Sequence, residues 1–293
     1  MPRTVLITGC SDGGMGASLA KEFHSRGDRV FATARNPSKM ASLKTVGIET
    51  LQLDVVSEQS IQACVRQVSS LTGGSLDVLV NNAGRALCMP LTDLPIAEAK
   101  QVFDINFWAI LRMSQIFFPL LRQAARTNGH ALLVNQTSVS SIGGAPFFGA
   151  YNTSKAAAAM LVQNLRLELA PFGIKVIELK TGAVKTNIHD NDPVCQLPPE
   201  SPYTAIKEEI AKFSKGDDRK MNEQDPTIWA RNVVNDLDKT HPPIIIWRGT
   251  AASRVRLASV LPLTLFDSIF RKVSKLDVLE QRLKASHANE SRG

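Results

Sequence analysis

Three side chains in the second half of the chain have types and spacing suited to acid–base chemistry on an oxygen atom. Tyr151 is one of only two tyrosines in 293 residues, Lys155 follows it by four positions, and Ser138 precedes it by thirteen. Positions i and i+4 share one face of a helix, so the ammonium of Lys155 is predicted beside the phenol. A phenol with a pKa of about 10 needs such a cation, which lowers that pKa, to work near neutral pH. Ser138 can donate to a substrate oxygen that becomes negative as hydride arrives. The set predicts a site that reduces a carbonyl group or oxidises the corresponding alcohol.

The spacing alone is weak, because a tyrosine followed by a lysine at i+4 occurs by chance in many helices. A structural tyrosine and a solvated surface lysine are the alternative interpretation. Ser140 and Ser141 are nearby candidates for the serine; the family resemblance described below implies Ser138, which alone has the family's interval to Tyr151. The prediction therefore depends on the place of these residues in the order of strands and helices.

A glycine-rich turn lies between the first predicted strand, Val5–Thr8, and the first predicted helix. Glycines let the backbone turn tightly and approach a diphosphate, and the N-terminus of the helix supplies unpaired N–H donors. The turn therefore predicts a dinucleotide-binding fold. We expect the cofactor to lie against Gly9, Ser11, Gly14, Met15 and Gly16.

The second predicted strand, Val30–Ala34, indicates which dinucleotide is bound. A site for NAD usually has a carboxylate after this strand to bind the ribose 2′-hydroxyl, and this chain has none there. Arg35 follows the strand instead, and its guanidinium suits a 2′-phosphate. The sequence predicts NADP(H), with a solvated surface arginine as the alternative role of Arg35.

Short apolar runs alternate with helical stripes along the chain, which indicates βαβ units and a parallel sheet. Long helices are predicted over Glu98–Ala125, with a kink or interruption at Pro119, and over Tyr151–Ala170. The fold class is α/β: a single Rossmann-type doubly wound domain with a parallel sheet of about seven strands flanked by helices. The predicted strands are Val5–Thr8, Val30–Ala34, Thr50–Leu53, Leu76–Val80, Ala131–Asn135, Ile174–Leu179 and Pro242–Trp247.

We assign the catalytic domain to residues 1–250 and a C-terminal helical extension to residues 251–293. Residues 187–224 are proline-rich and then charged, which predicts a substrate lid, with a solvated surface excursion as the alternative. From Leu257 onward, apolar patches alternate with basic residues, which indicates a pair of amphipathic helices. They either pack on the fold and close the pocket, as we expect, or contact a second subunit or a membrane surface.

Composition narrows the classes of function. The net charge is +7, but no run of five basic residues occurs, so we expect no nucleic-acid partner. The four cysteines are scattered, without metal-ligand spacing, so we expect reduced thiols and no metal site. Neither a signal peptide nor an apolar stretch of membrane-spanning length is evident. We expect a cytoplasmic protein that can also bind peripherally to an intracellular membrane.

Together, these features resemble the classical short-chain dehydrogenase/reductase family. The resemblance is strong over residues 1–186 and rests on the turn from Thr8 to Gly16, on Asn81-Asn82-Ala83-Gly84, and on the Ser138, Tyr151 and Lys155 set. It implies that these three are catalytic and that Asn106 anchors a water-linked proton relay to the lysine. It further implies cofactor contacts from Tyr151, Lys155, Asp54, Val55, Asn82, Ala83, Gly84, Gly182, Val184 and Thr186.

The chain departs from the family pattern at two places. The glycine turn has one extra residue after Gly9, which leaves open which amides face the phosphates. Thr181 stands where the family commonly has a proline before Gly182, so this turn is expected to be looser.

The turn, the basic tail and the stretch from Gly182 to Asn187 are also similar to fungal-type 1-acyl-dihydroxyacetone-phosphate reductases and to 17β-hydroxysteroid dehydrogenases. This similarity implies a lipophilic ketone or alcohol substrate. Members of the wider family are often dimers or tetramers, and the tail of this chain favours a homodimer. The pocket is expected to be lined by Cys88, Met89, Pro146, Phe147 and Phe148, which could equally belong to the core. A tailoring enzyme of secondary metabolism with a specialised or non-redox step, and a non-catalytic NADP(H)-binding protein, are the alternatives.

Overall fold

Seven parallel strands form one sheet in this computed structural model, which describes residues 2–188, 195–216 and 223–290. The strand order is β3-β2-β1-β4-β5-β6-β7, so the direction of winding reverses between β1 and β4. This is the doubly wound Rossmann-type α/β fold that the sequence predicts. The strands are β1 (Thr4–Thr8), β2 (Arg29–Ala34), β3 (Glu49–Gln52), β4 (Val78–Asn81), β5 (Ala131–Ser138), β6 (Ile174–Thr181) and β7 (Ile245–Arg248).

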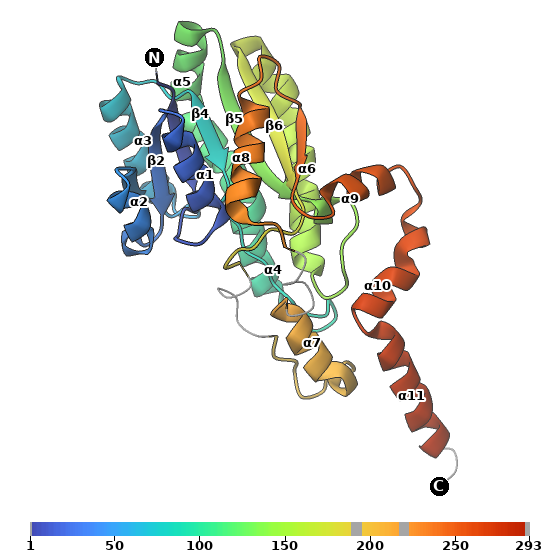
Figure 1. The fold of residues 1–293 in the computed structure, drawn as a ribbon. Coiled ribbons are helices and arrows are strands. Elements are labelled where there is room, and N and C mark those ends of the chain that lie inside the picture. The colour runs from blue at the N-terminus through green and yellow to red at the C-terminus, as the bar shows by residue number, and fades with distance from the viewer. Residues whose placement is uncertain (1, 189–194, 217–222, 291–293) are drawn as a thin grey trace.

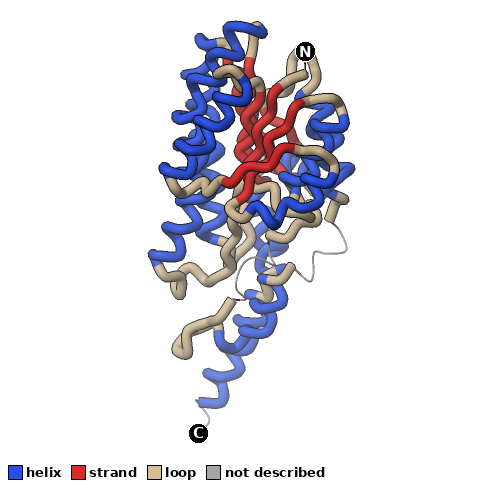
Figure 2. The backbone as a smooth tube through the Cα atoms, turned by 90° about the vertical axis from the view of Figure 1, so that its left-hand side faces the viewer, coloured by secondary structure: helices blue, strands red, loops and turns tan. Residues whose placement is uncertain are grey.

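Helices cover both faces of the sheet, as Figure 2 shows. Val5 and Ile7 belong to the core on the side of α1 and α8, whereas Leu6, between them, packs with α3, α5 and α6. Successive side chains of a strand point to opposite faces, so a continuous apolar run fills both cores. These helices are α1 (Met15–Ser25), α3 (Glu58–Thr72), α5 (Ala109–Asn128), α6 (Gly149–Leu169) and α8 (Pro226–Leu237), with the short η1 (Pro37–Met40) and α2 (Ala41–Thr45) after β2.

The long helix predicted over Glu98–Ala125 contains a wider turn that the sequence did not indicate. It consists of α4 (Ile96–Phe103), a π-helical turn η2 (Asp104–Trp108) and α5. Helix α5 continues through Pro119 without interruption. Phe117 and Leu121 are fully buried on either side of this proline, and such packing can offset the roughly 3 kcal/mol cost of an internal proline.

Helix α8 is an element that the sequence analysis missed. The carboxylate of Asp225 caps it by accepting bonds from the N–H groups of Thr227 (2.8 Å) and Ile228 (3.1 Å). Pro226 occupies the first helical position, and Trp229 is fully buried against the sheet. An aspartate followed by proline is a recognisable start signal for a helix.

The predicted lid contains η5 (Thr204–Ile206) and α7 (Lys207–Ser214), while its residues 189–194 and 217–222 lie outside the described part. The described part of the extension contains α9 (Ala252–Ala258), η7 (Leu263–Phe266) running into α10 (Asp267–Val273), and α11 (Leu276–Glu290). Helices α10 and α11 follow Leu257, where the sequence indicates a pair of helices, and α9 begins before it. Figure 1 shows α7 and α11 at the end of the molecule opposite to the N-terminus. Among the described residues, none of the helices is both long and apolar enough to cross a membrane.

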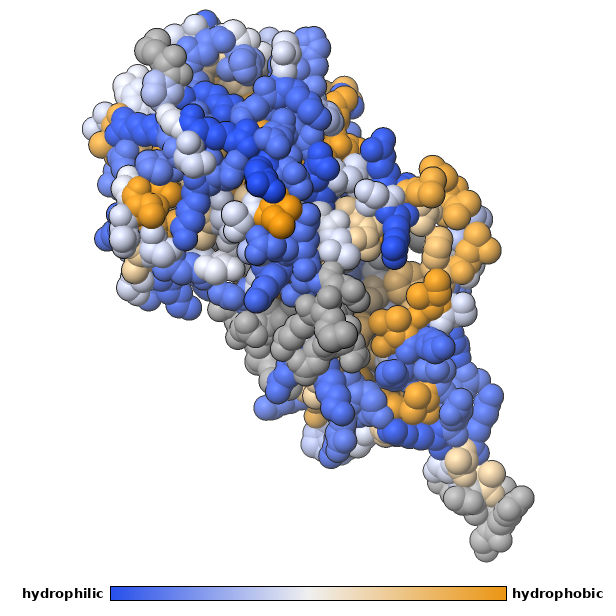
Figure 3. Space-filling view, in the orientation of Figure 1, coloured by the Kyte–Doolittle hydropathy of each residue, from blue (hydrophilic) through white to orange (hydrophobic). Residues whose placement is uncertain are grey.

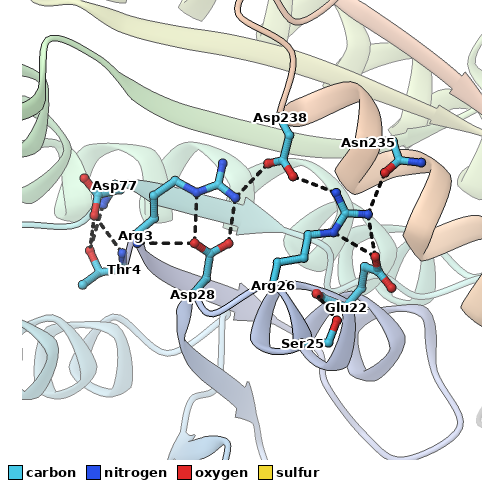
Figure 4. A network of polar contacts seen from close by, with 9 residues as sticks. All are labelled: Arg3, Thr4, Glu22, Ser25, Arg26, Asp28, Asp77, Asn235 and Asp238. Carbon is cyan, nitrogen blue, oxygen red and sulfur yellow. Dashed lines mark hydrogen bonds and ion pairs between the residues drawn. The ribbon is translucent and has the colours of Figure 1, made fainter. Parts of the chain in front are cut away.

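A network of charged side chains joins the beginning of β1 to the C-terminal ends of α1 and α8 (Figure 4). Arg3 pairs with Asp28 at 2.7 Å and with Asp238 at 2.8 Å. Asp238 also pairs with Arg26 at 2.7 Å, and Arg26 binds Glu22 at 2.6 Å. The pKa of Arg3 is raised because its acidic partners outweigh the opposing effect of burial. The network lies at the amino ends of the strands.

Candidate active site

The carboxyl ends of β1, β4 and β5 form the edge of the sheet where the winding reverses. In open α/β sheets, the crevice outside these ends is where ligands bind. Thr8 ends β1, Asn82 directly follows β4, and Ser138 ends β5. The fold therefore brings the predicted cofactor turn and the predicted catalytic serine to one edge.

Two glycines of the turn have no room for a side chain. A Cβ atom on Gly16 would lie 2.5 Å from the carbonyl oxygen of Gly9 and 2.6 Å from the Asn82 amide nitrogen. Gly9 has a φ of +74°, and a Cβ there would lie 2.9 Å from the Cα atom of Ala83. Glycine is thus required for α1 to begin close to the ends of both β1 and β4.

The extra residue in the turn determines which amides remain available. The N–H groups of Cys10, Asp12 and Gly14 all donate to backbone carbonyls of the protein. Those of Ser11 and Met15 have no such acceptor among the described residues. The amides of Ser11 and Met15 are therefore available to a ligand, whereas the amide of Gly14 is bonded to the carbonyl of Ser11 at 3.0 Å.

An acidic residue within the turn binds two segments that are distant in sequence. The carboxylate of Asp12 accepts from the hydroxyl of Ser42 (2.5 Å) and from its N–H group (3.1 Å). The carbonyl of Asp12 accepts from the side-chain amide of Asn187 at 3.0 Å, so the loop after β6 reaches across to the turn. Neither contact was predicted, because each joins segments that are distant in sequence.

The ends of β1 and β4 are tied together by side chains. The hydroxyl of Thr8 accepts from the N–H groups of Asn82 and Ala83, both at 2.9 Å, and Asn82 donates its amide to the Thr8 carbonyl at 2.8 Å. The remaining oxygen of Asn82 is buried without a partner among the described residues, as is the hydroxyl of Thr181 at the end of β6. Both atoms are therefore available to a polar ligand in the crevice.

The remaining predicted cofactor residues occupy the rim of the crevice. Arg35 is exposed at the end of β2, without an ion pair to the described part of the chain. The carboxylate of Asp54 accepts from the N–H group of Val56 at 3.1 Å, and Val55 is buried.

The loop after β6 is close-packed in spite of the missing proline. Gly182 donates its N–H group to the Arg248 carbonyl at 2.8 Å, and a Cβ on Gly182 would lie 2.1 Å from the Thr250 carbonyl oxygen. Val184 is buried, and the hydroxyl of Thr186 accepts from the backbone two residues on. The turn that was expected to be looser is held by β7 and the segment that follows it.

The π-helical turn places Asn106 in the interior beside α6. Its side chain accepts from the N–H group of Arg85 (2.9 Å) and donates to the Arg85 carbonyl (2.8 Å) and to the hydroxyl of Ser154 (3.0 Å). A Cβ on Gly84 would lie 3.3 Å from the Asn106 oxygen and 3.6 Å from Nζ of Lys155. Asn106, Gly84 and Lys155 are therefore neighbours, and π-turns are frequent at functional sites.

Lys155 is almost fully buried beside Tyr151 on α6. Its Nζ atom donates to the Gln136 carbonyl at 3.0 Å and lies 5.9 Å from the centre of the Tyr151 ring. Burial lowers the pKa of Lys155 to about 8, because the charged form loses its hydration. The structure brings this cation and the tyrosine together as the sequence predicts.

Ser138 ends β5 and caps the following 3-10 turn, η3 (Val139–Ser141). Its hydroxyl oxygen accepts from the N–H group of Ser140 at 3.1 Å. A hydroxyl has one donor besides its acceptor sites, so the proton of Ser138 stays available for a substrate oxygen.

A buried ion pair behind the serine turn was missed by sequence reasoning. Nζ of Lys180 lies 2.6 Å from the carboxylate of Glu178 and donates to the hydroxyl of Ser141 at 2.8 Å. Glu178 also accepts from the hydroxyl of Thr137 at 2.9 Å. Glu178 and Lys180 are two positions apart on a buried strand, so their side chains lie on the same face. That spacing of opposite charges is the feature of the sequence from which the ion pair could have been predicted.

An apolar cluster lies next to Tyr151, which packs against its edge. Among the residues predicted to line the pocket, Cys88, Phe147 and Phe148 are buried in it, Met89 contacts the sulfur of Cys195 at 3.8 Å, and Pro146 is half-buried. The lid contributes Ile206, Ile210 and Phe213, and α11 contributes Leu276 and Leu279.

Phe147 adopts a backbone conformation that is rare for a bulky residue. Its φ is +69°, and its carbonyl accepts from the N–H group of Met89 at 2.7 Å. Its ring packs edge-on against Tyr203 and Phe213 of the lid, at 5.7 and 6.4 Å between centres. Such strain persists where the surroundings enforce it, often at ligand sites.

Comparisons with known proteins agree with this geometry. Residues 3–193 match the sequence profile of the short chain dehydrogenase family. A short-chain dehydrogenase/reductase of Pestalotiopsis microspora is 44% identical over 97% of this chain and 98% of its own length. An NADPH-dependent 1-acyldihydroxyacetone phosphate reductase of Schizosaccharomyces pombe is 36% identical over 93% of this chain and 94% of its own.

The fold is also found in solved structures. A short-chain dehydrogenase from Streptomyces avermitilis superposes with a TM-score of 0.73 at 26% identity, over 96% of this chain and 97% of its own.

Proposed function

This chain belongs to the short-chain dehydrogenase/reductase family, and we propose that it is an NADP(H)-dependent reductase of lipophilic ketones with Tyr151 as the proton donor. One observation carries the proposal: a buried lysine lies beside a tyrosine whose ring borders an apolar cluster closed by the lid and α11. The reverse reaction oxidises the corresponding alcohol at the same site.

The proposal assigns each side chain of the site a role. NADPH held in the crevice would supply a hydride for the carbonyl carbon. Tyr151 gives its phenolic proton to the carbonyl oxygen, and Ser138 donates a hydrogen bond to that oxygen as its negative charge grows. The ammonium of Lys155 stabilises the phenolate that Tyr151 leaves behind, and Asn106 anchors the route by which a proton returns.

The crevice fits a phosphorylated dinucleotide. The amides of Ser11 and Met15 suit the diphosphate at the start of α1, and glycine at positions 9 and 16 lets α1 begin close to the ends of β1 and β4. Arg35 suits the 2′-phosphate that distinguishes NADP from NAD, because it is exposed at the end of β2 and the residues that directly follow this strand, up to Lys39, include no carboxylate. The NADPH-dependent relative of fission yeast supports this choice.

The lining of the pocket supports a lipophilic substrate. Aromatic and aliphatic side chains from the loop after β4, the segment before α6, the lid and α11 converge beside Tyr151. A mostly apolar pocket with few polar groups selects by shape and hydrophobicity. A long-chain acyl ketone phosphate, a steroid ketone, retinal and an aromatic polyketide ketone are the substrates to compare.

The test is NADPH oxidation by the purified protein with each of these four compounds. Tyr151→Phe should abolish turnover and leave NADPH binding intact, because only the phenolic proton is lost. Tyr203→Phe is the matched control: it removes the other tyrosine hydroxyl of the chain, that of a lid residue whose ring packs on Phe147, and should retain turnover.

Equal turnover in Tyr151→Phe and the wild type would remove Tyr151 from the chemistry. Tight NADPH binding with no turnover of any compound would contradict the lipophilic ketone as substrate. That result would favour a specialised metabolite or a non-catalytic NADP(H)-binding protein.

A further inference from the structure

The C-terminal extension presents large apolar side chains to solvent. Val260 is 81% exposed and Leu257 is 76% exposed, in a protein whose other aliphatic side chains mostly fill two cores. Figure 3 shows hydrophobic surface gathered along the extension. Apart from Leu283 of α11, the large apolar residues that the structure shows as exposed in the extension lie between residues 257 and 273: Leu257, Val260, Leu261, Leu265, Ile269 and Val273.

Three of these residues lie on one side of the helical segment. Leu265, Ile269 and Val273 follow one another at intervals of four along η7 and α10, so they form a single stripe. In a helix of a soluble protein such a stripe normally faces the core. Helix α10 instead buries none of its described side chains, and its principal contacts are with η7 and α11, its neighbours in sequence.

Basic residues accompany the apolar stripe. Residues 251–275 contain five basic side chains and one acidic side chain, a net charge of +4. Arg271 pairs with Glu280 of α11. Within the described ranges, the other cations of the segment have no ion-pair partner: Arg254, Arg256, Lys272 and Lys275.

We propose that residues 254–275, the docking segment, bind the surface of an anionic lipid membrane. Exposed aliphatic side chains enter the boundary between headgroups and acyl chains, and neighbouring cations pair with anionic headgroups. A second copy of the chain fits the docking segment less well than an anionic membrane does. A twofold contact would place two surfaces of the same net positive charge against each other.

The docking segment connects directly to the apolar cluster beside Tyr151. Helix α11 follows α10 after two residues, and its Leu276 and Leu279 pack into that cluster. Arg282 of α11 pairs with Glu209 of the lid at 2.7 Å. A membrane-bound docking segment would thus hold the lid and the pocket near the lipid phase, where a lipophilic substrate is concentrated. This last step rests on the proposed function; membrane binding itself does not.

The experiment is co-sedimentation of the full chain with phosphatidylcholine vesicles that contain or lack phosphatidylserine. We expect binding to the anionic vesicles that weakens with added salt. Leu265→Glu/Ile269→Glu and Lys272→Glu/Lys275→Glu should each lower the partition coefficient about tenfold or more, by removing insertion or charge attraction. Leu71→Glu and Arg66→Glu, exposed residues of α3, are matched controls that should bind like the wild type.

Two further measurements keep the outcome clear. NADPH binding should be equal in all variants, since the docking segment lies outside the cofactor crevice, and this verifies folding without relying on turnover. Light scattering reports the oligomeric state. Absent vesicle binding, or binding unchanged in both docking-segment variants, overturns the proposal. So does a wild-type dimer without vesicle binding that becomes monomeric in Leu265→Glu/Ile269→Glu, because a second copy then covers the surface.

Discussion

At the scale of single residues, the burial of Lys155 should appear in the pH dependence of stability. Burial lowers its pKa from 10.5 to about 8. The unfolded chain, in which lysine has its ordinary pKa, therefore binds more protons between these values, so the free energy of unfolding rises with pH across this window. We expect a rise of about 3 kcal/mol from this side chain and its absence in Lys155→Met.

The measurement is urea denaturation of the cofactor-free wild type and Lys155→Met at a series of pH values. Only the difference between the two curves is informative, because other groups titrate in both proteins. Lys39→Met, which removes an exposed lysine, should follow the wild type. Parallel curves for the wild type and Lys155→Met would show that the lysine keeps its ordinary pKa in the fold.

Arg35 carries the choice between the two dinucleotides. If its guanidinium binds the 2′-phosphate, Arg35→Ala should weaken NADPH binding about 10- to 100-fold, the value of one or two charge-assisted hydrogen bonds, and leave NADH nearly unchanged. Fluorescence titration with both cofactors measures this. Arg66→Ala provides the control for loss of an exposed arginine. Equal losses for NADPH and NADH would exclude this role for Arg35.

At the scale of elements, the sequence predicted those strands and helices whose residues show a local apolar or helical pattern. The apolar runs ending at Thr8 and Asn135 identified buried strands, and helical spacing placed Tyr151 and Lys155 on one face of α6. The π-helical turn at Asn106 escaped prediction, since its side chain is fixed by backbone groups of Arg85 and by Ser154, far away in sequence. Tertiary contacts of this kind leave no periodic signal.

The ion pair between Glu178 and Lys180 is another such contact, and it supports the turn that holds Ser138. Lys180→Met would leave the Glu178 carboxylate buried without its cation and should lower the free energy of unfolding by about 3 kcal/mol. Because Lys180 also binds Ser141, we expect kcat to fall while the KM for NADPH stays unchanged.

The double variant Glu178→Gln/Lys180→Met separates the two effects. It removes both charges and should recover part of the lost stability, but not the hydrogen bond to Ser141 and hence not kcat. Urea denaturation and steady-state kinetics measure the two quantities. A full recovery of kcat together with stability would mean that the pair acts on stability alone.

At the scale of the whole molecule, the carboxyl ends and the amino ends of the strands differ in how their polar groups are paired. The carboxyl ends carry unpaired polar atoms, a strained Phe147 and the buried Lys155. The amino ends carry the ion-pair network of Arg3, Arg26 and Asp238, in which every charged group has an oppositely charged partner (Figure 4). Sites that bind ligands keep unsatisfied groups, and their cost must be offset elsewhere in the fold.

This division predicts that stability can be changed at one end without changing the chemistry at the other. Asp238→Asn removes the carboxylate shared by Arg3 and Arg26 and should lower the free energy of unfolding by about 1–2 kcal/mol. NADPH affinity and kcat should remain unchanged at temperatures where the variant is folded.

Glu168→Gln is the control. It changes an exposed carboxylate of α6 with no ion pair to the described residues, and it should alter neither stability nor activity. Thermal denaturation measures the stability, and NADPH oxidation the activity, of the wild type and the two variants. A loss of kcat in folded Asp238→Asn would show that the amino-end network is coupled through the sheet to the candidate active site.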